Sequence, residues 1–113
     1  EIIEEFKPDT AALETLFFFK NQTTVMQVAE TRGIIISNLL RHNVEIFQYT
    51  PRQIKSAVAG HGAADKTGVE KLVRLQLKLP EDTKIIDDTY DALAALLTHA
   101  GVCKVAKMRS KFD

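Results

Sequence analysis

The sequence has a single cysteine and no excess of charge of either sign. Cys103 is the only cysteine among 113 residues, so an internal disulfide cannot form and a cysteine zinc site is not expected. Its expected role is that of a small apolar side chain. Lysine plus arginine equals aspartate plus glutamate at 15 each, so overall charge does not indicate nucleic-acid binding. A surface for an anionic partner must therefore come from local clustering.

Long apolar runs and targeting signals are also missing. The longest apolar stretches, residues 17–19 and 33–36, are far shorter than the roughly 20 residues of a membrane span. No charged-then-apolar segment with a cleavage site opens the chain, so a signal peptide is not visible. We expect a cytoplasmic protein with no membrane partner. The 45% hydrophobic and 27% charged residues are typical of a globular protein, and no repeat or low-complexity linker divides the chain.

The two ends of the chain differ from its middle. Residues 1–6 have the pattern of an amphipathic helix already in progress, without an initiating methionine or a capping residue, so we expect that the beginning has been lost. Residues 103–113 carry Lys104, Lys107, Arg109 and Lys111 and are expected to form a basic, weakly ordered tail. The predicted organisation is one domain over residues 1–102 followed by this tail.

Strand, helix and strand are predicted in the first half of the chain. Residues 10–19 are dense in apolar side chains and too short for a full amphipathic helix, which indicates a buried strand of the parallel type. Asn21 or Thr23 can cap a helix that runs to about Arg41. Residues 44–49 alternate in the manner of a second strand.

Three helices are predicted in the second half, over residues 51–58, 64–79 and 87–101. Thr50 followed by Pro51 is a start signal for the first, because proline at the first helical position loses no hydrogen bond. Pro80 stops the second helix, which begins at residue 64 or 65. Asp87 or Asp88 can cap the third, and Gly101 ends it.

Glu14 stands in an otherwise apolar strand. An ionised carboxylate is costly there unless it lies at the open end of the strand or meets a cation. In open α/β sheets the ligand crevice lies at the carboxyl ends of parallel strands, and the loop to the next helix follows Glu14 within a few residues. Its placement favours a functional site; the alternative is a strand-end glutamate paired with a basic side chain.

Asp88 and Asp91 are three residues apart, which places them on one face of a helix and close enough to share a cation. Asp87 adds a third carboxylate. Acidic residues are also common in a first helical turn because the helix dipole stabilises them, so the spacing alone leaves that alternative open. Together with Glu14 they offer the oxygen ligands that magnesium prefers. Two such ions about 4 Å apart can support phosphodiester hydrolysis.

Three further positions are candidates for contacts with nucleic acid. Lys55 and Lys66 lie near predicted helix ends, where phosphate contacts are easily made, although each fits a solvated helix face equally well. Phe17 belongs to a run of three phenylalanines that cannot all face one core, so one could wedge against an unstacked base. Packing against a helix is the commoner role. His99 could assist a metal or water, or serve in capping or packing.

Taken together, these segments resemble the RuvC family, whose members have the ribonuclease-H-like fold. The resemblance rests on residues 12–17 with Asn21, residues 49–55 with 60–66, and residues 77–80 with 88–94 and 98–99. Their order and spacing agree with the family from Glu1 to about Val102. Gly68 and Tyr90 depart from it, since the family commonly has glutamine and a small residue at these positions.

The resemblance implies an α/β fold with a mixed sheet flanked by helices and with the N-terminal strands missing. The family opens with a strand that bears an aspartate, and no such strand precedes Glu1. With that aspartate, Glu14, Asp88 and Asp91 would hold two Mg²⁺ ions, for which Mn²⁺ could substitute. The resemblance further implies DNA contacts from the residues Phe17, Arg52, Lys55 and Lys66.

The implied activity is a structure-specific DNA endonuclease that resolves four-way junctions in recombination and repair. The implied assembly is a homodimer that works with a RuvA and RuvB branch-migration complex. As given, the chain is expected to be inactive because one ligand is absent. Two rival interpretations stay open: a related ribonuclease-H-like nuclease that processes RNA, and a non-catalytic DNA-binding or dimerisation module whose carboxylates are helix caps.

Overall fold

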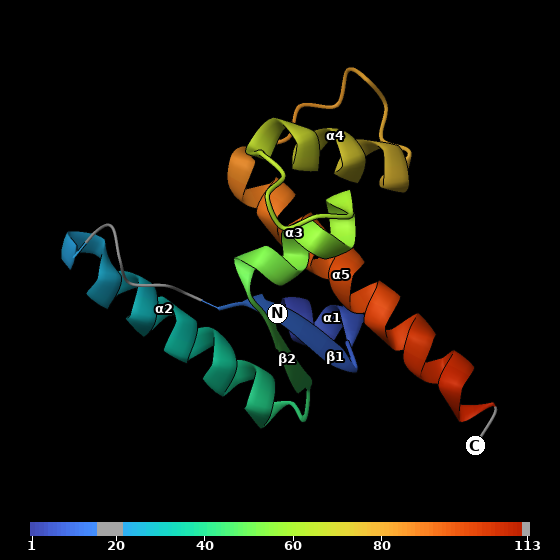
Figure 1. Ribbon diagram of the computed structural model, residues 1–113. Helices are drawn as coiled ribbons and strands as arrows, with labels where there is room; N and C mark the ends of the chain where they lie inside the picture. The colour runs from blue at the N-terminus through green and yellow to red at the C-terminus, as the bar shows by residue number, and fades with distance from the viewer. Residues whose placement is uncertain (16–21, 112–113) are drawn as a thin grey trace. The chain divides into compact units, whose positions relative to one another are not determined.

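The computed structural model describes residues 1–15 and 22–111, and the chain divides into two compact units, Glu1–Gln48 and Tyr49–Asp113. Figure 1 shows the elements in chain order: α1 (Ile2–Phe6), β1 (Thr10–Glu14), α2 (Gln22–Arg41), β2 (Glu45–Tyr49), α3 (Pro51–Ala59), α4 (Lys66–Leu77) and α5 (Asp87–Ser110). Among the described residues, none of these helices combines the length and hydrophobicity of a membrane span.

The first unit is a strand–helix–strand arrangement, as the sequence predicts. β1 and β2 form a two-stranded sheet, and the 20-residue helix α2 connects them (Figure 1). The Glu45 N–H donates to the Asp9 carbonyl at 3.0 Å, so the two strands start side by side. This is the arrangement of a parallel pair, which needs a long crossover connection of this kind.

The strand predicted over residues 10–19 is described only as far as Glu14, and residues 16–19 lie outside the described part of the chain. The alternation predicted for residues 44–49 is wrong. Val44 and Tyr49 are both buried although they should face opposite sides, and Ile46 and Phe47 are both half-buried. Packing against the surrounding elements, rather than a simple two-residue period, decides burial in this short strand.

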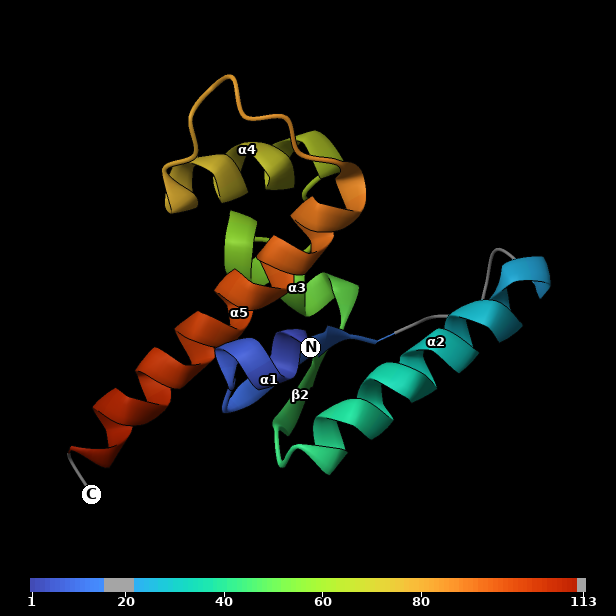
Figure 2. The same ribbon diagram turned by 180° about the vertical axis from the view of Figure 1, so that it is seen from behind.

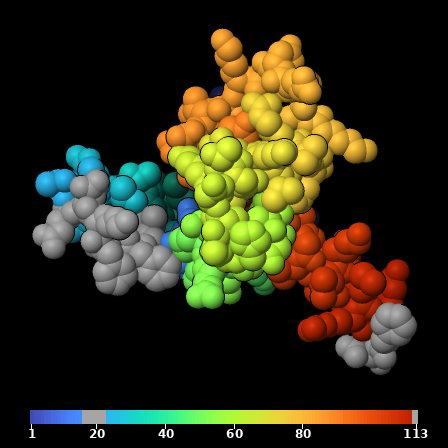
Figure 3. All heavy atoms as spheres, turned by 45° about the horizontal axis from the view of Figure 1, so that its top comes forward, coloured from blue at the N-terminus to red at the C-terminus, as the bar shows by residue number. Residues whose placement is uncertain are grey.

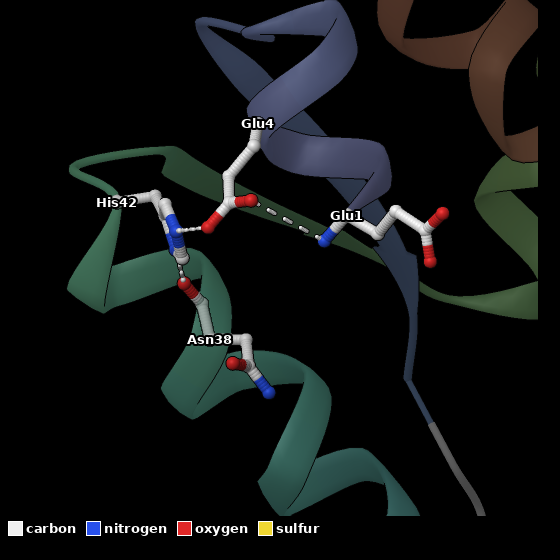
Figure 4. A network of polar contacts seen from close by, with 4 residues as sticks. All are labelled: Glu1, Glu4, Asn38 and His42. Carbon is white, nitrogen blue, oxygen red and sulfur yellow. Dashed lines mark hydrogen bonds and ion pairs between the residues drawn. The ribbon is translucent and has the colours of Figure 1, made fainter.

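The N-terminal helix α1 confirms the predicted helix over residues 1–6 and contacts the end of α2 through polar groups (Figure 4). The His42 Nε2 lies 3.8 Å from the Glu4 carboxylate, and its Nδ1 lies 2.8 Å from the Asn38 carbonyl. The amino terminus of Glu1 lies 4.0 Å from the same carboxylate. These groups are exposed, so each ion pair contributes little to stability.

Local capping signals set the starts of α3 and α4. The Gln53 N–H donates to the Thr50 hydroxyl at 3.1 Å, and the Thr50 N–H donates to the Gln53 side chain at 2.7 Å, with Pro51 at the first helical position. The Asp65 carboxylate accepts from the Gly68 N–H at 2.7 Å. Both predicted starts are therefore confirmed. The capping side chains accept hydrogen bonds from backbone N–H groups that have no partner within the first turn of a helix.

The second helix of this unit ends earlier than predicted. α4 stops at Leu77 instead of Leu79, because Lys78 adopts the left-handed conformation with φ of 52°. The Leu79 N–H then donates to the Arg74 carbonyl at 3.0 Å, which closes the helix end before Pro80.

The second unit is held together by a core among its three helices. Val73 of α4 is fully buried at 0% exposure, and Ile54 and Val58 of α3 and Ala94 and Ala95 of α5 are also buried. The Gln76 side chain donates to the Val58 carbonyl at 3.1 Å and joins α4 to the end of α3. Apolar burial of this kind supplies most of the stability of short helices.

Arg74 fixes the segment between α4 and α5. Its guanidinium lies 5.5 Å from the centre of the Tyr90 ring, within the range of a cation–π contact. It also donates to the Pro80 carbonyl at 3.2 Å and to the Thr83 carbonyl. One side chain therefore links α4, the following loop and the first turns of α5.

The predicted end of the last helix is wrong. α5 runs from Asp87 through Gly101 to Ser110, so the segment expected to be a weakly ordered tail is helical to that residue, and the boundary predicted at residue 102 lies inside α5. Figures 1 and 2 both show this part of α5 extending past α3 and α4. A glycine lowers helix propensity by only about 1 kcal/mol, which a long helix anchored by core residues tolerates.

The start of α5 also differs from its prediction. Ile86 occupies the capping position without a side-chain hydrogen bond, and Asp87 and Asp88 lie in the first turn. Basic residues Lys107 and Arg109 lie in the last turn. This distribution of charge complements the helix dipole at both ends.

A buried hydrogen bond ties α5 to the residue that opens the second unit. The Tyr49 hydroxyl lies 2.7 Å from the His99 Nδ1, and their exposed fractions are 8% and 5%. The Cys103 thiol lies 3.5 Å from the His99 Nε2. His99 therefore has a packing role in this unit, one of the alternatives that the sequence leaves open.

Replacement of Tyr49 by phenylalanine should destabilise the chain by about 1–3 kcal/mol, because it removes the hydroxyl from a buried polar pair. Urea unfolding of both proteins measures the difference. Tyr90→Phe is the matched control, since no hydrogen bond of the Tyr90 hydroxyl occurs within the described residues. An equal loss in the two variants would contradict the assigned role of the bond.

The same comparison has a predicted pH dependence. Burial, with a smaller effect of the Cys103 thiol, raises the pKa of Tyr49 above its ordinary value of 10.0. The folded chain holds this proton more tightly than the unfolded chain does. The stabilisation that comes from the protonated Tyr49 hydroxyl is therefore complete below pH 10 and is lost as the pH rises through the pKa of Tyr49 in the folded chain. The difference in free energy of unfolding between wild type and Tyr49→Phe should shrink in that range.

Candidate functional site

Glu14 is the last residue of β1 and is half-buried, as expected for a carboxylate at the open end of a strand. It borders an open hollow of about 460 Å³ between the end of β1 and α2. Side chains from both elements line this hollow, namely Leu13, Gln27, Val28, Thr31, Arg32 and Ile35.

Arg32 holds the peptide group of Glu14. From α2, its guanidinium donates to the Glu14 carbonyl at 2.8 Å and to the Gln48 side-chain oxygen at 2.6 Å. Arg32 was not among the residues that the sequence predicted for this site. The available signal was its position, since Arg32 falls among Val25, Ile36 and Leu39 on the side of α2 that packs inward.

Asp88 and Asp91 lie in the first two turns of α5, and both are exposed. Their spacing of three residues places them on one face of that helix, as predicted. Neither side chain is used as the cap of α5, because Ile86 occupies that position. The interpretation of Asp87 or Asp88 as the capping residue is therefore wrong, and the capping alternative does not account for Asp91.

Lys66 begins α4 and forms an ion pair with the first turn of α5. Its Nζ lies 2.8 Å from the Asp87 carboxylate, and both side chains are exposed. The hydrogen bond that Lys66 donates to Asp87 raises the pKa of Lys66 against a smaller opposing effect of desolvation, and the charges of Asp87, Asp91 and Glu70 raise it further. The cation predicted to bind phosphate thus lies beside the acidic start of α5.

Arg52 and Lys55 lie on α3, where Arg52 is exposed and Lys55 is half-buried. Figure 3 shows α3 and α4, coloured green to yellow, as one continuous face of the second unit. The Arg52 side chain packs over Gly62 in the loop between these helices. A side chain at Gly62 would place its Cβ 2.7 Å from the Arg52 Cγ and 3.1 Å from its Nε.

The described structure brings some of the predicted site residues together and leaves others apart. Lys66 lies with Asp87 and near Asp91, whereas Glu14 belongs to the other unit. Within residues 1–15 and 22–111, no three histidine, cysteine or acidic side chains form a metal-binding group. Phe17 lies outside the described residues. A metal site shared by Glu14, Asp88 and Asp91 stays a prediction.

Comparison with a protein-family profile gives a match over residues 1–99, and the family is described as "Crossover junction endodeoxyribonuclease RuvC". The matched region contains all three candidate carboxylates and all the candidate basic residues. The chain belongs to the RuvC family. The resemblance inferred from the sequence is therefore confirmed.

Two curated relatives show how much of a RuvC protein the chain represents. The RuvC of Petrotoga mobilis is 48% identical over 98 residues, which cover 87% of this chain and 60% of that protein. The RuvC of Caldicellulosiruptor saccharolyticus is 44% identical over 98 residues, which cover 87% of this chain and 58% of that protein. The chain thus spans about 60% of the length of the curated relatives that it matches.

Solved structures confirm the predicted fold class. The chain is similar to Thermus thermophilus RuvC with a TM-score of 0.82 and 32% sequence identity, over 93% of this chain and 63% of that one. A structure of the same protein in complex with a Holliday junction substrate matches equally well. The fold is therefore the α/β, ribonuclease-H-like fold of RuvC.

Gly62→Ala tests the packing of Arg52 in the candidate DNA-binding surface. In the wild-type background we expect the free energy of unfolding to fall by about 1–3 kcal/mol, because the new methyl group overlaps the Arg52 side chain. In an Arg52→Ala background the loss should fall below about 0.5 kcal/mol, since the overlapping atoms are gone. Denaturant unfolding of the four proteins measures both values. Equal losses in the two backgrounds would show that Arg52 is not the cause, and would point to the Ser56 hydroxyl, which lies 3.3 Å from the same Cβ position.

Proposed function

We propose that the chain is the matching part of a Holliday-junction resolvase, an endonuclease that cuts four-way DNA junctions in recombination and repair. The observation that carries the proposal is the RuvC match over residues 1–99, which includes Glu14, Asp88 and Asp91. The similar Thermus thermophilus protein, solved with a Holliday junction substrate, supports the same substrate for this chain.

The donor set of the three carboxylates fits hard divalent ions. Glu14 borders an open hollow, and Asp88 and Asp91 are exposed on one face of α5; carboxylate oxygens are the ligands that such ions prefer. We propose that they hold two Mg²⁺ ions, with Mn²⁺ as a substitute. When bound, such ions neutralise charge on the phosphate and lower the pKa of water.

Arg52, Lys55 and Lys66 supply the proposed phosphate contacts. Phosphate contacts fix the register and orientation of the DNA, while they carry no sequence information. Lys66 lies 2.8 Å from Asp87, so a phosphate that binds Lys66 would compete with that carboxylate for it. Phe17 is proposed to approach the bases at the junction, as the family resemblance implies.

A homodimer is proposed for the assembly, because paired cuts in opposing strands need two sites. Exposed apolar side chains on α2 support this, since Met26, Ile34 and Leu40 are 68%, 63% and 61% exposed. Covering such residues with a second copy would remove apolar area from water. Cooperation with RuvA and RuvB and a cytoplasmic location complete the proposal, and the inactivity expected for the 113-residue chain stays a prediction.

Binding of a four-way junction tests the proposed function. We expect the chain, without divalent ions, to bind a four-way junction more tightly than a linear duplex of the same sequence. Lys55→Ala and Lys66→Ala should weaken binding and reduce the slope of log affinity against log salt by about 1 for each lysine. Gel-shift titrations at several salt concentrations give both quantities.

The matched control is a variant with Lys71→Ala and Lys84→Ala, two exposed lysines of the same unit with the same change in charge. It should bind like wild type. If the control loses as much affinity for the junction as the variant with both Lys55→Ala and Lys66→Ala, the loss comes from the change in net charge alone. Equal binding of junction and duplex would contradict junction recognition, and tighter binding of structured RNA would favour an RNA-processing nuclease.

A further inference from the structure

The last part of α5 carries basic side chains and no acidic ones. Lys104, Lys107, Arg109 and Lys111 follow one another there, and residues 92–112 contain no aspartate or glutamate. All four basic residues are exposed, and Figures 1 and 2 show this part of the helix extending past α3 and α4. The chain is neutral overall, but this end of α5 is strongly positive.

Three of these basic residues lie on one face of the helix. Lys104 and Lys107 are three residues apart, and Lys111 follows four residues later with its backbone still in the right-handed helical conformation. Residues three and four apart on a helix are neighbours on its surface. At 1.5 Å per residue, the three lysines span about 10 Å along the helix.

The other face of the same segment is made of small and apolar residues. It borders an open hollow of about 660 Å³ on the side of α3, lined by Gly101, Val102, Val105 and Ala106 together with Ala57 of α3. In a helix of 3.6 residues per turn, these positions of α5 lie on the opposite side from Lys104 and Lys107. The lysines therefore lie on the face of α5 that is turned away from α3.

No carboxylate competes for these lysines in the part of the chain that the structure describes. None of its ion pairs involves Lys104, Lys107 or Lys111, whereas Lys66 lies 2.8 Å from Asp87. The helix dipole stabilises cations only within the last turn, and Lys104 lies before that turn. The dipole therefore does not account for the whole row of lysines.

Duplex DNA fits this surface better than an anionic membrane does. Along each strand, B-form DNA carries one phosphate for about every 3.4 Å of its axis, so the row of lysines matches about three phosphates. Helices that lie in a membrane surface bury Trp, Phe or Leu side chains on their apolar face. Here the opposite face has glycine, alanine and valine, and Arg109 also lines the hollow.

We propose that Lys104, Lys107 and Lys111 form a second DNA-contact surface, which binds the phosphate backbone of a duplex arm of the junction. The proposal rests on the proposed function, since it takes DNA to be the partner of the chain. The family match ends at residue 99, before the first of these lysines. Lys104 is 16 residues beyond Asp88, which is about 24 Å along the same helix. The contact is therefore with an arm, away from the bonds that are cut.

The test is a set of gel-shift titrations of the 113-residue chain at several salt concentrations, with a four-way junction and with linear duplex. In a variant with Lys104→Ala and Lys107→Ala, the slope of log affinity against log salt should decrease in magnitude by about 2. Affinity at about 0.1 M salt should fall about 10-fold. Because a backbone contact on an arm is the same in both DNAs, the ratio of the two affinities should stay within about twofold of wild type.

Two controls separate a contact with phosphate from other effects. A variant with Lys71→Ala and Lys84→Ala removes the same charge from exposed positions of the same unit and should keep the wild-type slope. A variant with Lys104→Arg and Lys107→Arg keeps the charge and should also keep it. Alanine favours the helix at least as well as lysine does, so circular dichroism should show unchanged helix content in every variant.

The outcomes that overturn the proposal are distinct. A wild-type slope in the Lys104 and Lys107 alanine variant would overturn it, and so would an equal decrease in the Lys71 and Lys84 control. Co-sedimentation with vesicles of equal parts phosphatidylcholine and phosphatidylserine gives a third reading. If the wild-type chain binds these vesicles, and the alanine variant loses that binding while its DNA affinity is unchanged, the surface belongs to a membrane.

The two DNAs also separate this proposal from the function on which it depends. Equal binding of junction and linear duplex by the wild-type chain, with a lower slope in the Lys104 and Lys107 alanine variant, would reject junction recognition and keep the DNA-contact surface. Preference for the junction with an unchanged slope in that variant would reject the surface alone. A wild-type chain that binds neither DNA would reject both.

Discussion

The cost of taking an ionised carboxylate out of water decides where the acidic candidates can lie in this fold. Glu14 is at the end of a strand beside an open hollow, and Asp88 and Asp91 are in the first exposed turns of a helix. At both places an acidic side chain avoids the full cost of burying an ionised group. Basic side chains lie at the same two places. Arg32 donates to the backbone at the strand end, and Lys66 forms an ion pair at the helix start.

Polar contacts between distant segments hold the backbone that carries these side chains. In the first unit, Arg32 joins the ends of the two strands. In the second unit, the Tyr49–His99 hydrogen bond joins α5 to the residue at the start of that unit. Arg74 adds a link from α4 to the first turns of α5 through Tyr90. Since preorganised ligands bind metal more tightly than mobile ones, these contacts connect the packing of each unit to the proposed chemistry.

Local signals in the sequence predicted the starts of α3 and α4, because Thr50-Pro51 and Asp65 act on backbone groups within three residues. The last helix was predicted to end at Gly101, since local propensity does not include the packing that carries α5 to Ser110. Arg32 was missed because its partners are 18 and 16 residues away. The family was predicted from the residues, order and spacing of several motifs. The metal site proposed for Glu14 and the aspartates depends on contacts between distant residues, which no local pattern encodes.

We propose above that Glu14 and the aspartates of α5 serve one divalent-ion site. Paramagnetic broadening by Mn²⁺ tests it most directly, in NMR spectra of the chain with substoichiometric metal. We expect the signals of Glu14, Asp88 and Asp91 to broaden together at the lowest Mn²⁺ concentrations, before those of other acidic residues such as Glu4, Glu45 and Asp82. Broadening of the aspartates without Glu14, or equal broadening at every exposed carboxylate, would contradict it.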